Sequence, residues 1–180
     1  MAIRYIHAAK AGIEKRTSFM FPRLHKHVSN AVRDQIRQVI FQKKGRETQA
    51  YDTFVMGRYV CNNSLCDNKA WTSKKVGVVI RRFADSGHGI GYNATVFNQR
   101  CKSCDTLGNF SLDVNSYVER VAYRLRVWAG VPQEEAPFTS DEIGPPHEQD
   151  LCEGCKEGRC QRGKQMKSIY DDEDDLTFMK

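Results

Sequence analysis

The chain has 180 residues, of which 40% are hydrophobic and 28% charged, a balance that fits one modest globular domain and disfavours two independent cores. No apolar run approaches the roughly 20 residues needed to cross a bilayer, and the N-terminus lacks the continuous apolar segment of a secretory signal. These features disfavour membrane-spanning and secreted proteins and predict an intracellular one, in the cytoplasm or nucleus. Residues 1–16 are basic, so their composition also fits an amphipathic organelle-targeting segment.

The net charge of +6 hides a strong asymmetry along the chain. Residues 1–50 carry a net charge of +8, residues 51–130 carry +5, and residues 131–180 carry −7. The acidic third includes an unbroken run of Asp and Glu at 171–175, which is typical of a solvated, disordered tail. We therefore expect residues 163–180 to be an acidic disordered tail.

The first predicted element is an N-terminal helix over residues 22–42. Apolar residues recur there at three- and four-residue steps, and Pro22 suits the first turn of a helix. Residues 1–49 are therefore interpreted as a basic, helical N-terminal region. Residues 43–49 contain no apolar side chain and predict a loop, after which a short strand over 54–60 leads into the first cysteine pair.

Two further strands are predicted at 71–83 and 92–99, because both segments are rich in β-branched and aromatic residues. The glycine-rich segment 84–91 between them predicts a loop, so the two strands should form an antiparallel hairpin. Residues 113–129 have an amphipathic helical pattern that ends at Gly130, and this helix should pack on the sheet. The proline-rich segment 132–147 predicts an extended connection.

Seven cysteines are many for an intracellular chain of this length, and their odd number excludes complete pairing in disulfides. Their spacing favours metal binding, because two thiolates in one tight turn can bind the same ion and a tetrahedral zinc site usually takes two such pairs. The closely spaced cysteines are Cys61 and Cys66, Cys101 and Cys104, and Cys152, Cys155 and Cys160.

The predicted hairpin indicates which cysteines share an ion, because an antiparallel hairpin places its two ends side by side. In this sequential scheme one zinc ion is bound by Cys61, Cys66, Cys101 and Cys104, and a second by His147, Cys152, Cys155 and Cys160. A crossed scheme is an open alternative, in which the first pair joins Cys152 and Cys155 while the second pair joins His147 and Cys160. His147 is the weakest candidate, since a lone histidine after two prolines can be an ordinary loop residue.

Both predicted sites are filled by four protein ligands, whereas a catalytic zinc site uses three and leaves a position for water. The two zinc ions are therefore expected to be structural and to contribute folding free energy, and the chain is expected not to be an enzyme. A thiol-redox catalyst is a weaker alternative. Cys-x2-Cys redox motifs normally open a helix within a βαβ unit, which the sequence does not predict.

Four motifs follow one another along the chain: YVCNNSLCDNKAWTSKKVGVVIR, GYNATVFNQRCKSC, LDVNSYVERVAYRLRVWAGV and GPPHEQDLCEGCKEGRC. This combination resembles the 3CxxC-type zinc finger domain, which occurs in many fungal proteins and in animal receptor-transporting and zygote-arrest proteins. The resemblance covers residues 50–162. It departs from the family pattern in the four residues between Cys61 and Cys66, a spacing that can still chelate.

The strands, the amphipathic helix and the zinc sites together predict an α+β fold. A small antiparallel, zinc-ribbon-like sheet would carry the packed amphipathic helix, and the N-terminal helix would precede it. The zinc-binding domain would span residues 50–162.

The first predicted function is nucleic-acid binding, with RNA favoured. A positive surface binds phosphates in a salt-dependent way, and exposed aromatic rings stack on unpaired bases. The resemblance to zygote-arrest proteins, whose domain of this type is associated with RNA, favours the same hypothesis. The candidate contacts are Lys74, Lys75, Arg81, Arg82, Arg100, Lys102, Arg120 and Arg124.

The second predicted function is a protein-binding adaptor or chaperone, which the resemblance to receptor-transporting proteins implies. The basic N-terminal helix could contact an acidic protein or an anionic membrane surface. A continuous basic groove would favour RNA, whereas an exposed apolar face on residues 22–42 would favour a protein client. Neither hypothesis requires a small-molecule substrate.

Overall fold

The computed structural model describes residues 4–7, 15–84, 87, 89–133 and 147–160. The predicted acidic tail lies outside these residues, as do most of the connection 132–147 and most of residues 1–16. In the described ranges, no helix is long and apolar enough to span a bilayer.

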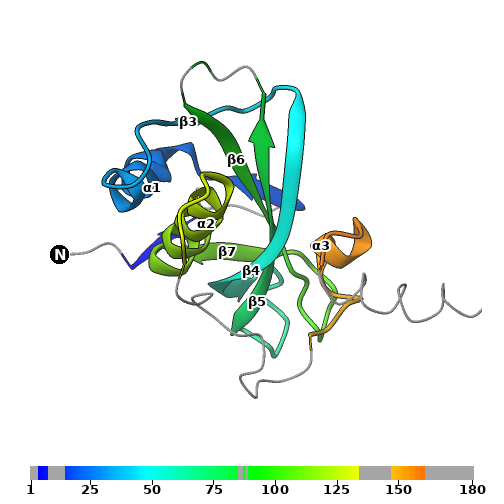
Figure 1. Ribbon diagram of the computed structural model, residues 1–180. Coiled ribbons are helices and arrows are strands. Elements are labelled where there is room, and N and C mark those ends of the chain that lie inside the picture. The colour runs from blue at the N-terminus through cyan, green and yellow to red at the C-terminus, as the bar shows by residue number, and fades with distance from the viewer. Residues whose placement is uncertain (1–3, 8–14, 85–86, 88, 134–146, 161–180) are drawn as a thin grey trace, which may run out of the picture.

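Within this part of the chain, seven strands form one curled and mainly antiparallel sheet (Figure 1). The strands are β1 (Tyr5–His7), β2 (Ser18–Met20), β3 (Val39–Phe41), β4 (Glu47–Cys61), β5 (Ala70–Phe83), β6 (Ile90–Phe97) and β7 (Gly108–Asp113). Their order is β1-β7-β4-β5-β6-β2, and β3 pairs in parallel with the first residues of β6, Ile90 to Tyr92. The mixture of this sheet with a few helices is consistent with the predicted α+β class.

The described helices lie on both sides of the sheet. A 3-10 turn (Pro22–Leu24) leads into α1 (His25–Val32), which packs beside α2 (Val114–Trp128) on one face. The short helix α3 (Glu153–Lys156) lies on the other side and contacts β5 and β6 (Figure 1).

The predicted antiparallel pairing of the two central strands is confirmed, because β5 and β6 pair from Val78 with Val96 to Phe83 with Gly91. The strand before the first cysteine pair is longer than predicted and begins at Glu47, inside the predicted loop 43–49. Its first residues are exposed, so they carry no hydrophobic signal. Backbone pairing with the end of β5 keeps them extended.

The predicted helix over 22–42 is wrong in length and in place. Helix α1 ends at Val32, residues 39–41 form β3, and both β1 and β2 precede the helix in the chain. The apolar spacing continues past the helix because Ile36 and Val39 are also buried in the core. Pairing of β3 with β6 supplies the backbone hydrogen bonds of this segment instead.

The predicted amphipathic helix over 113–129 corresponds to α2 and packs against β4. Its first turn is capped by Asp113, whose Oδ1 accepts a hydrogen bond from the backbone N–H of Ser116 at 2.9 Å. Gly130, at φ +73°, ends it as predicted. Burying Tyr117 and Leu125 against the sheet stabilises the fold by about 1.5–3 kcal/mol per side chain.

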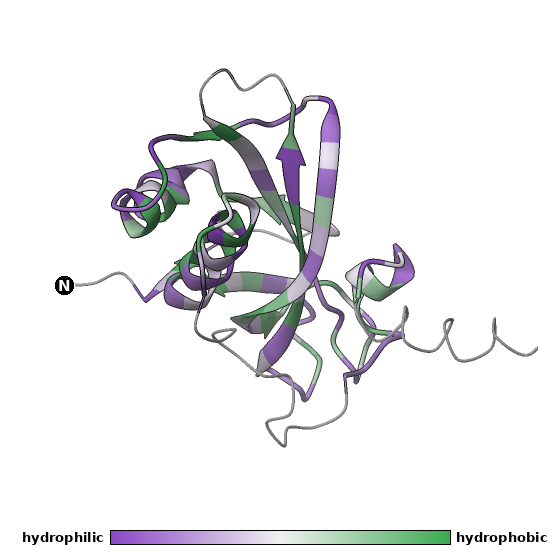
Figure 2. Ribbon diagram, viewed as in Figure 1, coloured by the Kyte–Doolittle hydropathy of each residue, from purple (hydrophilic) through white to green (hydrophobic). Residues whose placement is uncertain are grey.

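The two faces of the sheet are covered differently. Hydrophilic and hydrophobic residues alternate along the strands (Figure 2). Successive side chains of a strand point to opposite faces of the sheet, so the two faces differ in polarity. On β6, Tyr92, Ala94 and Val96 join the core beneath α1 and α2. The side chains between them face the opposite side, where residues 147–160 pack over Phe97.

Candidate metal centres

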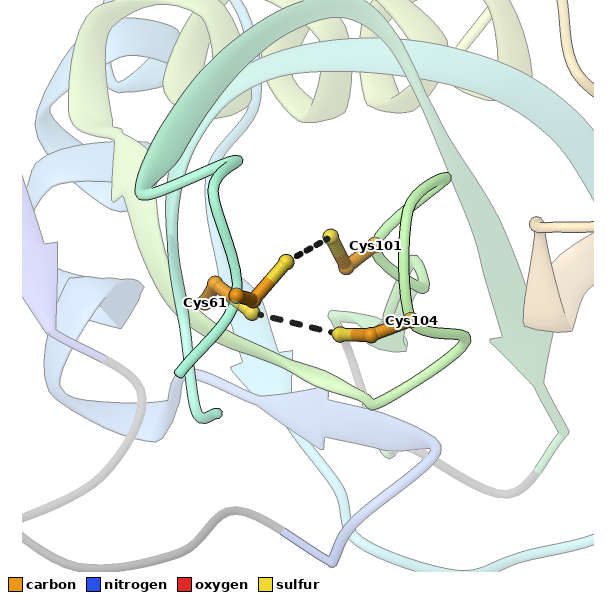
Figure 3. Close-up of side chains that lie close together, drawn as sticks. Cys61, Cys101 and Cys104 are labelled. Atoms are coloured by element: carbon orange, nitrogen blue, oxygen red, sulfur yellow. Dashed lines mark hydrogen bonds between the residues drawn. The ribbon is translucent and has the colours of Figure 1, made fainter. Parts of the chain in front are cut away.

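Two turns at one end of the sheet bring the first four cysteines together. Cys61 ends β4 and Cys66 lies in the turn between β4 and β5, whereas Cys101 and Cys104 lie in the connection between β6 and β7. Figure 3 shows the sulfur atoms of the two segments facing each other. The four Sγ atoms all lie within 4.8 Å of one another.

The distances within this cluster fit a tetrahedral zinc ion. The Sγ atoms of Cys61 and Cys104 are 3.5 Å apart, and those of Cys66 and Cys101 are 3.7 Å apart. With Zn–S bonds of about 2.3 Å, sulfur atoms at the corners of a tetrahedron lie about 3.8 Å apart. A disulfide needs an S–S length of about 2.05 Å, and all seven cysteines are free thiols.

The second cluster forms on the C-terminal segment 147–160. His147 Nε2 lies 3.1 Å from Cys155 Sγ, and the Sγ atoms of Cys152 and Cys160 are 3.7 Å apart. The four donor atoms lie within 4.8 Å of one another, which gives one imidazole and three thiolates. The two clusters fit two zinc ions, and the ligands are grouped as in the sequential scheme rather than the crossed one.

A buried asparagine joins the second segment to the sheet. The backbone O of Asn98 accepts a hydrogen bond from Glu153 N, and its Nδ2 donates to the backbone O of Arg16 and of Gly108. Its Oδ1 accepts from the N–H of Gln99, so this fully buried side chain uses both its oxygen and its nitrogen. Asn98 therefore joins the residues just before β2, the start of β7 and the segment 147–160.

Hydrogen bonds favour the thiolate form at two ligands of the first cluster. Hydrogen bonds from Thr106 lower the pKa of Cys104 to about 6. Burial opposes ionisation of Cys101, but hydrogen bonds from the Ser103 backbone and the Asn68 side chain outweigh it and lower the pKa. Burial raises the pKa of Cys66 to about 12. Because zinc binds the thiolate, metal binding would release a proton from that thiol.

The second cluster shows the same division. The hydrogen bond with Cys160 and the smaller effect of His147 outweigh burial and lower the pKa of Cys152 to about 4. Burial raises the pKa of Cys155 to about 11, and the shared hydrogen bond with Cys152 raises that of Cys160. Each cluster thus combines at least one cysteine with a lowered pKa and at least one whose raised pKa means that the metal must displace its proton.

Sequence reasoning missed the polar residues that contact the ligands. Thr106 Oγ1 lies 2.9 Å from Cys104 Sγ, and Asn68 Nδ2 donates to Cys101 Sγ at 3.4 Å. Such neighbours orient metal ligands and tune their basicity. Each lies two residues after a cysteine of a predicted turn, which is the signal that could have identified them.

The structure does not gather the eight candidate nucleic-acid contacts on one surface. They occupy three separate segments: β5 carries Lys74, Lys75, Arg81 and Arg82, the connection between β6 and β7 carries Arg100 and Lys102, and α2 carries Arg120 and Arg124.

Several of these cations already have protein partners. Arg81 Nε lies 3.1 Å from Glu47 Oε2, and Arg100 Nε lies 2.6 Å from Glu153 Oε1. Arg82 donates to the backbone O of Trp128 at the end of α2. These arginines therefore stabilise the fold, and substituting them would confuse loss of binding with loss of structure.

The guanidinium of Arg124 lies 3.2 Å from the centroid of the Tyr51 ring, a cation–π contact. Among the candidates, Lys74 on β5 and Lys102 between β6 and β7 are exposed.

Comparison with protein families agrees with the cysteine geometry. Residues 54–158 match the 3CxxC zinc ribbon family, which is described as a zinc-binding domain. Neither curated proteins nor solved structures give a significant match. Since the match covers more than half of the chain and includes every residue of the two clusters except Cys160, this protein belongs to the 3CxxC family of zinc-binding domains.

Proposed function

We propose that this protein is a non-enzymatic RNA-binding protein in which two structural zinc ions support a basic surface. The excess of positive charge carries the proposal. The described residues include 23 Lys and Arg against 11 Asp and Glu, so half of the chain's 22 acidic residues lie elsewhere in the sequence. A folded part with this excess attracts polyanions.

The arrangement of apolar surface supports RNA over a protein client. The apolar residues of segment 22–42 that would have formed a docking face, such as Leu24, Val28 and Val32, are buried in the core. Among the described residues, the large apolar side chains that are exposed are Met20, Val60, Leu65 and Val127. They come from four different elements or turns, which is ordinary for a protein surface.

The zinc sites support a binding role without catalysis. Each cluster offers four protein donor atoms, so an ion in it would have no open position for a substrate or a reactive water. The free thiols that bind the metal suit a reducing compartment, which supports location in the cytoplasm or nucleus.

The loop between β3 and β4 is the best-placed cationic contact for RNA. Lys43 and Lys44 are exposed there and have no charged partner in the described part of the chain. Sequence reasoning left this loop without a role. The resemblance to zygote-arrest proteins, whose domain of this type is associated with RNA, supports the same class of partner.

The test is binding of a fluorescent single-stranded RNA to the zinc-loaded full chain, measured by anisotropy across a salt series. We expect the logarithm of the affinity to fall linearly with the logarithm of the salt concentration. The double variant Lys43→Ala and Lys44→Ala should reduce that slope by up to about 1.4, because each phosphate contact on a single strand contributes about 0.7.

The matched control is the double variant Arg23→Ala and Lys26→Ala. It removes the same charge from exposed positions on the helix side of the sheet. A slope that falls equally in both variants would indicate a nonspecific charge effect. Wild-type protein with two bound zinc ions and no RNA capture would contradict the proposal and favour the protein adaptor.

A further inference from the structure

A cavity of about 400 Å³ opens on the face of the sheet opposite α1 and α2. It lies between the edge strand β2, the loop 43–45, the ends of β5 and β6, and Glu157 after α3. This volume falls within the range of small-ligand sites. The cavity is separate from both cysteine clusters, and neither the family match nor the zinc sites assign it a role.

Asn93, one of the residues that line the cavity, has a buried hydrogen-bond acceptor that no described residue uses. Asn93 is 2% exposed, and its Nδ2 donates to the backbone O of Gln42 at 2.9 Å and of Lys43 at 3.3 Å. Two carbonyl partners fix the orientation of this amide, because only the NH2 side can face them. The Asn93 Oδ1 atom is left without a hydrogen-bond partner. A buried unpaired acceptor costs free energy, which a ligand N–H would recover.

The neighbouring wall offers a hydroxyl beside this acceptor. Thr95 follows Asn93 by two residues on β6, so both side chains point to the same face. Thr95 Oγ1 accepts a hydrogen bond from Arg81 Nη1 at 3.0 Å, which leaves the hydroxyl hydrogen able to donate to a ligand. Phe83 and Phe97 line the same cavity and give it apolar walls.

The entrance of the cavity favours an anionic molecule. Lys43 and Lys44 line it and are exposed. Two acids also line it: Glu47, which pairs with Arg81, and Glu157, which is exposed. A planar group with N–H donors and ring acceptors would therefore fit inside, with its phosphate near the lysines.

We propose that this cavity receives one unpaired base of a single-stranded RNA. A base N–H donates to Asn93 Oδ1, the Thr95 hydroxyl donates to a ring or carbonyl acceptor, and the adjacent phosphate lies at Lys43 and Lys44. Such a pocket binds an unpaired base, and a duplex offers no unpaired base. This inference rests on the proposed RNA binding and specifies which form of RNA the protein selects.

The experiment fills the cavity without removing a described hydrogen bond. Ser18 lies on β2 at the cavity wall, and the substitution Ser18→Trp places a large side chain in the space. Thr72→Trp is the matched control, since Thr72 is exposed on β5 and does not line the cavity. Zinc content and the thermal transition establish that both variants fold.

We expect Ser18→Trp to weaken binding of a single-stranded RNA by about tenfold or more, as loss of one base contact does. The salt slope should stay unchanged, because the phosphate contacts remain. Thr72→Trp should bind as the wild type does. A duplex of the same length should bind more weakly than the single strand, with the same affinity for all three proteins.

A second measurement needs no variant. Titrating the ¹⁵N-labelled zinc-loaded protein with adenosine, cytidine or uridine 5′-monophosphate should shift the side-chain NH2 resonances of Asn93 and the backbone amides of Gly45 and Thr95. RNA binding that Ser18→Trp leaves intact, or nucleotide titrations that leave these resonances unmoved, would overturn the base pocket while the proposed RNA binding stands. Absence of RNA binding by the wild type would overturn both.

Discussion

The two zinc clusters use the same chemistry on different kinds of backbone. In the first, Cys61 and Cys104 are 43 residues apart in sequence and are brought together by turns of the sheet. In the second, the contacts of His147 with Cys155 and of Cys152 with Cys160 each join residues eight positions apart. The regular structure within this segment is the four-residue helix α3. The first cluster joins distant elements, whereas the second organises one local segment.

This difference predicts how much of the fold depends on each zinc ion. At the first cluster the ladder between β4 and β7 continues to Cys61, which pairs with Gly108, so the ligands belong to the same hydrogen-bonded framework as the core. The second segment contacts the framework through Asn98, Gln99 and Arg100 at the end of β6. We therefore expect loss of zinc from the first cluster to unfold the whole domain, and loss of zinc from the second cluster to unfold only residues 147–160.

The largest effect is expected from Cys101→Ser with Cys104→Ser. Structural zinc binding supplies roughly 10–16 kcal/mol in zinc-finger peptides, which exceeds the roughly 5–15 kcal/mol net stability of a domain. The variant should lose zinc and its cooperative thermal transition, as measured by native mass spectrometry and circular dichroism. A folded variant that keeps both zinc ions would disprove the assignment of these ligands.

A smaller effect is expected from Cys152→Ser with Cys155→Ser. This variant should bind one zinc ion and melt at a lower temperature, because residues 147–160 would leave the face around Phe97. Hydrogen exchange should become fast in that segment, while amides of β5 and α2 stay protected. The two cysteine variants serve as controls for each other, and global unfolding in both would show that the second segment is as integral to the core as the first.

The smallest of these effects is expected from Asn98→Ala, which removes the side-chain hydrogen bonds to Arg16, Gln99 and Gly108 and keeps the backbone oxygen that accepts from Glu153. It should lower the free energy of unfolding by about 3 kcal/mol with both zinc ions retained, since each buried group left without a partner costs about 1–3 kcal/mol. Chemical denaturation measures the change. The control is Asn109→Ala on β7, a half-buried side chain with no hydrogen bond in the described ranges. Equal losses in the two variants would contradict the stabilising role of the Asn98 side chain.

Features whose signal is local in the chain were predictable. The spacing of Cys101 and Cys104 reflects the reach of two thiolates in one turn, and the apolar stripe from Val114 to Leu125 reflects the 3.6-residue period of a packed helix. The hairpin of β5 and β6 was predictable for the same reason, because each strand carries its own β-branched residues.

Some features depended on contacts that no local pattern encodes. Residues 22–42 have one continuous apolar spacing, yet Val39 belongs to a strand because β6 offers it backbone partners. The three-residue strands β1 and β2 are too short for a periodic signal. The charge of Arg81 was visible in the sequence, but its pairing with Glu47 was not.

The sequence by itself determined that this protein binds zinc, which residues could serve as ligands and where its charge lies, because ligand chemistry and charge are properties of individual side chains. Only the tertiary structure decided how those ligands are grouped, which cations are already paired and that Asn93, at the wall of a cavity, has a buried acceptor without a partner. Grouping, pairing and enclosure depend on which distant segments become neighbours, and the packing of the whole sheet sets those neighbours.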